Sequence, residues 1–371
     1  MKKIVALVLS LALAVIAFAG CKAAPQAPAV TEAPAATEAA ATEAPTEAPA
    51  ATEAPAEATE APAAGAKTGL AVVTSVANSK AAAEEDGVAQ TDSMVVAVIV
   101  DENGVITKCA IDSVQAKIGF SKEGKLTTDP TTTFPTKQEL GSSYGMAKAS
   151  PIGKEWNEQI DALAAYCVGK TAEEVKGIAM TEKTAPADAD LAASCTISIA
   201  GYINAIAKAV ENAQVLGASA GDQLGLSITT NMSKSADVTA DKAGVAQAYS
   251  TFAVVTTGAD GAITSAIIDA CQANVNFDAT GAITSDLAAE IKTKNELGAD
   301  YGMAKASSIG KEWNEQAAAF AAYCVGKTAE AVKGIAMDAQ GLAADADLVA
   351  SVTVHIGDFM AVVSSAAAAA K

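Results

Sequence analysis

Two threonines stand out as side chains that could be chemically modified. Thr196 follows Asp190 by six residues, and Thr353 follows Asp347 by the same six residues, 157 positions further along the chain. Apolar and polar residues alternate over residues 195–199, which predicts a β-strand. With the apolar residues on one face of that strand, the threonine hydroxyl lies on the other face, where solvent or a modifying enzyme can reach it.

A tyrosine-containing segment is repeated at the same separation. Tyr144 begins the run Tyr-Gly-Met-Ala-Lys-Ala-Ser, and Tyr301 begins an identical run. Both runs belong to a longer block, residues 141–180 and 298–337, in which 33 of 40 positions are the same. A recent duplication explains part of this identity, and helix packing alone does not need so much. Two roles remain open for the segment: a ligand-facing surface and a structural loop.

These elements are positioned by a module that occurs twice. Residues 87–196 return without a gap as residues 244–353, and so long a period fits two tandem domains better than a solenoid. The pattern of each copy predicts a β-hairpin followed by a helix with an apolar stripe. In the first copy these are residues 94–111 and residues 153–169. A short helix with a capping box at Thr171 and a terminal helix follow. We therefore expect an α+β fold of two similar modules, each an antiparallel sheet with helices packed on one side.

The start of the chain carries export signals. Met1-Lys2-Lys3 is followed by about sixteen apolar residues and then by Phe-Ala-Gly-Cys, which ends at Cys21. This pattern is typical of a secretory signal peptide over residues 1–20, and the apolar stretch is short for a permanent membrane span. The last four residues resemble a bacterial lipobox, which implies cleavage before Cys21 and acylation of its thiol and new amino terminus. We expect a lipid-anchored protein on the extracytoplasmic face of the cell membrane.

The segment after Cys21 has the composition of a disordered linker. Residues 22–67 consist almost entirely of Ala, Pro, Thr and Glu and contain no aromatic residue, so they have little apolar surface with which to form a core. We interpret residues 21–67 as lipidated cysteine and linker, residues 68–214 as the first repeat, and residues 215–371 as the second.

Charge and residue usage exclude several classes of function. The chain has 43 acidic residues against 25 basic ones, all of them lysine, and a formal net charge of −18. Such a surface offers no basic stripe to a phosphate backbone, so we expect no nucleic-acid partner. His355 is the only histidine and no CxxC pair occurs, which argues against a histidine-based triad and a zinc site. Cys167 and Cys324 occupy equivalent positions, and we expect both to be small buried apolar residues.

The order of these motifs resembles the FMN-binding domain. The resemblance rests on the hairpin Asn103-Gly-Val-Ile-Thr-Lys108 and on an Asp-x-x-Ser-Gly-Ala-Thr-like element before a final helix, Gly201-Tyr-Ile-Asn-Ala-Ile206, and it covers about a third of each module. In that family a flavin transferase joins FMN to the last threonine through a phosphoester, and the domains transfer electrons outside the cytoplasm. The resemblance implies Thr196 and Thr353 as acceptors.

The same resemblance implies roles for further residues. Asp190 and Asp347 match the acid of the motif, and Tyr144 and Tyr301 are candidates for the wall beside the flavin ring. The family's Ser-Gly-Ala is Ala-Ser-Cys in one copy and Ala-Ser-Val in the other, so a serine replaces the glycine.

Two functions are compatible with these features. The first is a membrane-anchored electron carrier with covalent FMN, which needs a flavin transferase and a redox partner and turns over no substrate of its own. The alternative is a non-catalytic binding or structural lipoprotein of the cell envelope, whose modules have lost flavin and present two similar faces on a long tether.

Overall fold

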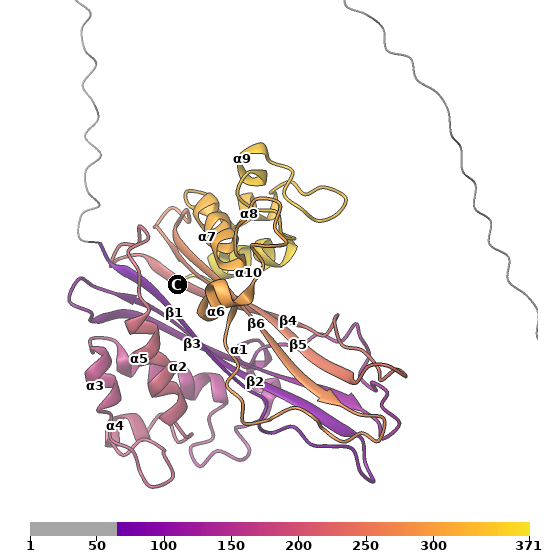
Figure 1. Cartoon of the computed structure of the whole chain (residues 1–371). Coiled ribbons are helices and arrows are strands. Elements are labelled where there is room, and N and C mark those ends of the chain that lie inside the picture. Colours follow the sequence, from indigo (N-terminus) through magenta and orange to yellow (C-terminus); the bar gives the residue numbers. More distant parts are fainter. Residues whose placement is uncertain (1–64) are drawn as a thin grey trace, which may run out of the picture. The chain divides into compact units, whose positions relative to one another are not determined.

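The computed structural model describes residues 65–371. The predicted signal peptide, the predicted lipidation site at Cys21 and nearly all of the predicted linker lie outside these residues. Within them, two similar α+β modules follow one another in the chain, as predicted (Figure 1).

Each module consists of three strands followed by short and long helices. The elements of the first module are β1 (Lys67–Ser75), β2 (Gly87–Val100), β3 (Ile106–Phe120), α1 (Lys137–Leu140), the 3-10 helix η1 (Gly141–Tyr144), α2 (Trp156–Cys167), α3 (Ala172–Lys176), α4 (Ala189–Ala192) and α5 (Ala200–Glu211). Those of the second module are β4 (Gln223–Asn231), β5 (Gly244–Thr257), β6 (Ile263–Phe277), α6 (Lys294–Leu297), η2 (Gly298–Tyr301), α7 (Trp313–Cys324), α8 (Ala329–Lys333), α9 (Ala346–Val349) and α10 (Gly357–Ala369).

The strands form two antiparallel sheets with the orders β1-β2-β3 and β4-β5-β6. The predicted hairpin is β2 and β3, and its turn is fixed by Asp101, whose carboxylate accepts the backbone N–H groups of Asn103 and Val105, both at 2.9 Å. Gly104 has a φ of 78°, a conformation that glycine adopts without strain. The sequence therefore sets this turn locally.

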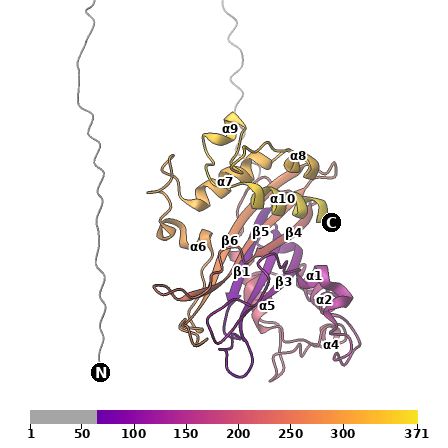
Figure 2. The ribbon, with the colours of Figure 1, turned by 90° about the vertical axis from the view of Figure 1, so that its right-hand side faces the viewer.

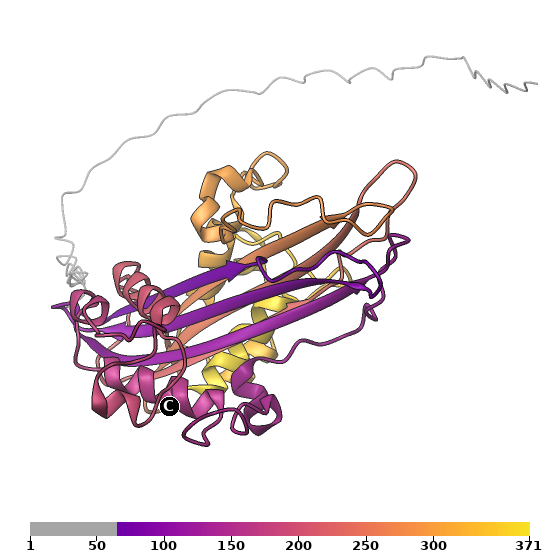
Figure 3. The same ribbon diagram turned by 90° about the horizontal axis from the view of Figure 1, so that it is seen from below.

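Both faces of each sheet are buried, but against different partners. In β2, Val96, Val98 and Val100 pack against helices of their own module. Val95, Ala97 and Ile99 alternate with them along the strand and pack in a cluster that includes strand residues of the second module. Each sheet is thus covered by its own helices on one face and by the other sheet on the other face (Figures 2 and 3).

The centre of the packing between the two modules is symmetric. The equivalent residues Phe120 and Phe277 stack on each other, with 4.3 Å between their ring centroids and 11° between the ring planes. Two equivalent backbone bonds also join the modules: Ala82 N–H donates to Gly281 O and Val238 N–H donates to Gly124 O, both at 2.9 Å. The same surface of each module therefore meets its counterpart, as in an isologous dimer, but within one chain.

The terminal helices approach the first strand of each sheet closely. A Cβ atom at Gly69 would lie 2.0 Å from the carbonyl oxygen of Ala209 in α5, and one at Gly225 would lie 1.9 Å from that of Ala366 in α10. Glycine at these positions lets helix and strand backbones come into contact. No helix in residues 65–371 has the length and apolar character needed to cross a membrane.

Candidate functional site

The segment that carries Thr196 does not form the predicted strand. Residues 195–199 run between α4 and α5 without strand pairing, and the same holds for the segment of Thr353 between α9 and α10. The buried residues are Cys195 and Ile199, four positions apart, which pack into the helical side of the module. The apolar alternation reflects this packing and is no evidence of a strand here.

A buried glutamine holds each threonine in place. Gln159 on α2 is fully buried, and its Oε1 accepts both the backbone N–H of Thr196 at 2.8 Å and the hydroxyl of Thr196 at 3.1 Å. In the second module, Gln316 on α7 accepts the same two groups of Thr353 at 2.8 and 3.2 Å. Since the hydroxyl hydrogen is directed to the glutamine, the lone pairs of the threonine Oγ1 are left for another partner.

The same glutamine ties the duplicated Tyr-Gly-Met segment to the site. The Nε2 of Gln159 donates to the hydroxyl of Ser150 and to the carbonyl of Lys154, both at 3.0 Å. Gln316 makes the equivalent bonds to Ser307 at 3.2 Å and to Lys311 at 3.1 Å. All the strong hydrogen-bonding groups of the buried amide are used, as burial requires.

A glutamate completes the attachment of this loop. Glu155 Oε2 accepts the N–H of Met146 at 2.7 Å, and Glu312 accepts those of Met303 and Ala304 at 2.8 and 3.1 Å. The Tyr-Gly-Met segment is therefore fixed to the start of α2 or α7 by side chains from the same duplicated block. These bonds give a physical basis to a structural role for the Tyr-Gly-Met segment.

A cleft of about 410 Å³ lies beside Thr353. Its apolar wall comes from Met303, Leu342, Val349 and Val352, and its polar residues include Ser307 and Asp338. Thr353 is half-buried and lines this cleft. The volume falls in the range of small-molecule sites, and the mixture of an apolar wall with a few polar groups is typical of them.

The predicted tyrosines lie elsewhere in the module. Tyr301 packs against the module core, with Lys294 Nζ 4.7 Å from its ring centroid, and its hydroxyl donates to Gln272 at 3.3 Å. Tyr144 has Lys137 Nζ at 4.9 Å. Tyr301 is not among the residues that line the cleft of Thr353, whereas Met303, two residues further on, is one of them.

The predicted aspartates are exposed residues in the first turn of a short helix. Asp190 lies in α4 and Asp347 in α9. The N-caps of these helices are Asp188 and Asp345, whose Oδ1 atoms accept the N–H groups of Asp190 and Asp347 at 3.0 and 2.9 Å. The acid that lines the cleft of Thr353 is Asp338.

Burial makes the duplicated cysteines poor nucleophiles. Cys167 and Cys324 are fully buried, as predicted, and loss of solvent raises the pKa of each thiol to about 12. All five cysteines of the described part of the chain are free thiols.

Gln159 and Gln316 are the residues of the site that sequence reasoning missed. Each is a polar residue inside the apolar face of a helix, three positions after Trp156 or Trp313, and each is kept in both copies. A buried polar residue in an apolar stripe usually has a partner to hold, and this signal was present in the sequence.

These features define a protein of two fused α+β modules, each with a glutamine-held threonine between its last two helices. Comparisons of the chain with protein-family models, with curated proteins and with solved structures found no match.

Proposed function

We propose that this chain is an extracytoplasmic lipoprotein, anchored through acylated Cys21, that carries FMN on Thr196 and Thr353 and transfers electrons. The observation that best supports this proposal is the threonine hydroxyl itself. Its hydrogen is held by a buried glutamine while, in the second module, its side chain lines a cleft large enough for a small molecule.

The residues around Thr353 are compatible with a flavin phosphoester. The hydroxyl oxygen would form a bond to the FMN phosphorus of a flavin–adenine dinucleotide while the P–O–P anhydride bond breaks, AMP leaves and the hydroxyl proton passes to water. Met303, Leu342 and Val349 offer an apolar wall to a flat ring. Ser351, which replaces the family's glycine, is not among the cleft-lining residues, and its hydroxyl donates to Leu348 O at 3.2 Å.

Bound FMN would supply the redox chemistry, since its ring system accepts and releases electrons. Gln316 would fix the modified residue through the backbone N–H of Thr353, since the ester has no hydroxyl hydrogen. The apolar side chains would keep water from one face of the ring. A covalent bond suits a protein without arginine, because lysine and hydroxyl groups alone hold a phosphate less firmly than a bidentate guanidinium.

The alternative, a non-catalytic envelope lipoprotein, is favoured by Asp338. Its carboxylate lines the same cleft as Thr353, and a negative charge there opposes the approach of a phosphate. The two proposals therefore differ in whether the hydroxyl is ever modified.

Mass spectrometry of the protein coexpressed with a bacterial flavin transferase distinguishes them. The carrier should gain one FMN mass per reactive module and turn yellow. Thr353→Ala should remove one of these masses, Thr196→Ala the other, and Ser198→Ala, a neighbouring exposed hydroxyl, should remove neither. Ser351→Gly should increase modification of the second module. Unmodified protein in both the native and the Ser351→Gly forms would refute the carrier and support the alternative.

The lipid anchor has an independent test. Cys21→Ser should abolish the acyl mass and release the protein from the membrane fraction, whether or not the modules carry flavin. Retention of the variant in washed membranes would contradict the anchor.

A further inference from the structure

The modules meet along two edges, which we call seams. One of the two seams contains two adjoining cavities. They measure about 380 and 270 Å³ and share Gln214, Ile267 and Asn295 as lining residues. We call their combined space the seam groove. It is bounded by β1 and the end of α5 from the first module and by β6, α6 and α7 from the second. It is separate from the Thr353 cleft, with which it shares no lining residue.

The larger cavity has an apolar wall. Ala318 and Ala322 on α7 are exposed and line it, so this face of the helix has no bulky side chain over it. Leu216 and Val325 line the same cavity and remain 37 % and 44 % exposed. Exposed large apolar side chains beside a cavity favour contact with an apolar ligand.

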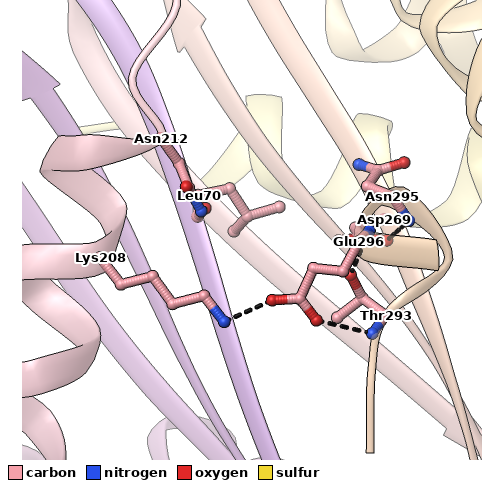
Figure 4. A network of polar contacts seen from close by, with 7 residues as sticks. All are labelled: Leu70, Lys208, Asn212, Asp269, Thr293, Asn295 and Glu296. Atoms are coloured by element: carbon pink, nitrogen blue, oxygen red, sulfur yellow. Dashed lines mark hydrogen bonds and ion pairs between the residues drawn. The ribbon is translucent and has the colours of Figure 1, made fainter. Parts of the chain in front are cut away.

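The polar side of the groove is rich in hydrogen-bond acceptors (Figure 4). Two of its amide nitrogens are engaged with protein carbonyls: Asn212 Nδ2 donates to Leu70 O at 3.2 Å, and Asn295 Nδ2 donates to Ile268 O at 2.9 Å. Lys208 is engaged by Glu296 across the seam. Asn314 lines the larger cavity, and its buried Oδ1 has no hydrogen-bond partner. A ligand that supplies donors suits such a lining.

The smaller cavity adds a buried carboxylate. Asp269 is 6 % exposed and accepts the N–H groups of Ala270 at 2.8 Å and Asn295 at 3.0 Å. Burial raises its pKa to about 6, so it is mostly ionised at neutral pH. Lys294 is a nearby cation, but its ammonium donates to the hydroxyl of Tyr249. No ion pair within the described residues satisfies Asp269.

We propose that the seam groove binds a small organic amine. The ammonium group of the ligand lies toward Asp269 and the side-chain carbonyl oxygens of Asn212 and Asn295. Its apolar ring or short chain lies over Ala318 and Ala322. The cation supplies the donors and the charge that the acceptor side lacks, and the apolar part covers the exposed wall.

The opposite seam provides a matched control. Its cavity of about 360 Å³ is lined by Asp112, the buried equivalent of Asp269, and by Ala165, the equivalent of Ala322, but the position of Ala318 is taken by Asp161. That carboxylate is bonded by Gln138 Nε2 at 2.8 Å. On the same side, Ala369 stands where the seam groove has Asn212. An apolar ring therefore has a better surface in the seam groove than in its counterpart.

Calorimetric titration of the full chain with 2-phenylethylamine tests the proposal. We expect saturable binding at one site and affinity about tenfold above that of the neutral 2-phenylethanol, since one charge-assisted bond contributes about that factor. The anionic 3-phenylpropionate should not bind. Equal affinities for the three probes, or no saturation by the amine at millimolar concentration, would overturn the proposal.

Variants locate the site. Ala322→Phe places a ring in the exposed part of the groove and should abolish amine binding, whereas Ala165→Phe in the opposite cavity should leave it unchanged. Asp269→Asn should bring the affinity for the amine down to that for the alcohol, with circular dichroism as the check on folding. Full binding by Ala322→Phe, or equal loss in Ala165→Phe, would rule out the seam groove as the site.

Discussion

The equivalent lysines of the two modules, Lys137 and Lys294, have different surroundings. In the second module, Lys294 is 5 % exposed and its ammonium lies 4.7 to 4.8 Å from the ring centroids of Tyr249, Tyr301 and Trp313. Burial lowers its pKa to about 8. Three aromatic faces and one hydroxyl thus take the place of water around a cation.

In the first module the third ring is missing. Lys137 is half-buried and lies 4.9 and 5.2 Å from the rings of Tyr144 and Trp156. The position of Tyr249 is occupied by Asp92, whose carboxylate is bonded by the amides of Gln90 and Gln115 at 2.8 and 2.7 Å. The exchange of Tyr249 for Asp92 on the central strand therefore accompanies the difference between a buried lysine and a half-buried one.

The two stacked phenylalanines should contribute equally to the stability of the interface between the modules. Removing either ring gives the largest expected effect. Phe120→Ala and Phe277→Ala each remove one ring of the stacked, fully buried pair, and each should lower the free energy of unfolding by about 3–5 kcal/mol. Urea denaturation measures both. A large inequality between the two variants would show that the modules do not contribute equally to their interface.

The equivalent acids Asp112 and Asp269 should make the protein more stable as the pH falls from 7 to 5. Burial raises the pKa of each to about 6, above the value of an unfolded chain, so the folded state binds these protons more tightly. Stability is then lost as the pH rises through 6, by about 1 kcal/mol for each acid between pH 5 and 7. The urea midpoint of the native protein should fall as the pH rises from 5 to 7, and this dependence on pH should be weaker in Asp112→Asn and in Asp269→Asn. A midpoint that rises with pH in the native protein would contradict the assignment.

Exchange of the residue beside the buried lysine tests the comparison directly. Tyr249→Asp removes one ring and admits water and a carboxylate, so the pKa of Lys294 should rise by about two units. NMR titration of the lysine side-chain resonances measures this change. Tyr249→Phe, which keeps the ring and loses only the hydroxyl, is the control and should leave Lys294 buried. An unchanged Lys294 titration in Tyr249→Asp would mean that the ring is not what buries it.

The smallest effect concerns a helix cap. In α3, Thr171 and Glu174 form a complete capping box, but in α8 the glutamate is replaced by Ala331 and only the Thr328 bond remains. Ala331→Glu should therefore stabilise the second module by about 0.5 kcal/mol, and Glu174→Ala should destabilise the first by a similar amount. Thermal unfolding measures both, and destabilisation by Ala331→Glu would show that the box does not form there.

Local patterns in the sequence were sufficient for much of the fold. The hairpin turn at Asp101, the apolar stripe of α2 and the cap at Thr171 depend on residues close together in the chain, and all three were predicted. The strand at residues 195–199 was wrong, because alternation over so few residues cannot distinguish a strand from an irregular segment with two buried side chains. Strand β1 was not predicted, since it follows directly on the Ala- and Pro-rich stretch.

The parts that depend on distant residues were out of reach. The continuous apolar run Met94–Val100 indicates burial on both faces, but nothing local says that the second face meets the other module. Likewise, Gln159 and Thr196 are 37 positions apart, and their contact depends on how α2 packs. The threonines were selected from a motif, whereas the residue that holds them could be recognised only once the helix was in place.

The interface around the stacked Phe120 and Phe277 should stay formed when the protein is diluted. Two separate subunits joined through such a surface dissociate on dilution, because their association depends on mass action. Here the partner is supplied by the same polypeptide, at an effective concentration that bulk dilution does not change. A single cut in the segment between α5 and β4 should then give two fragments that elute together under native conditions and separate only in denaturant.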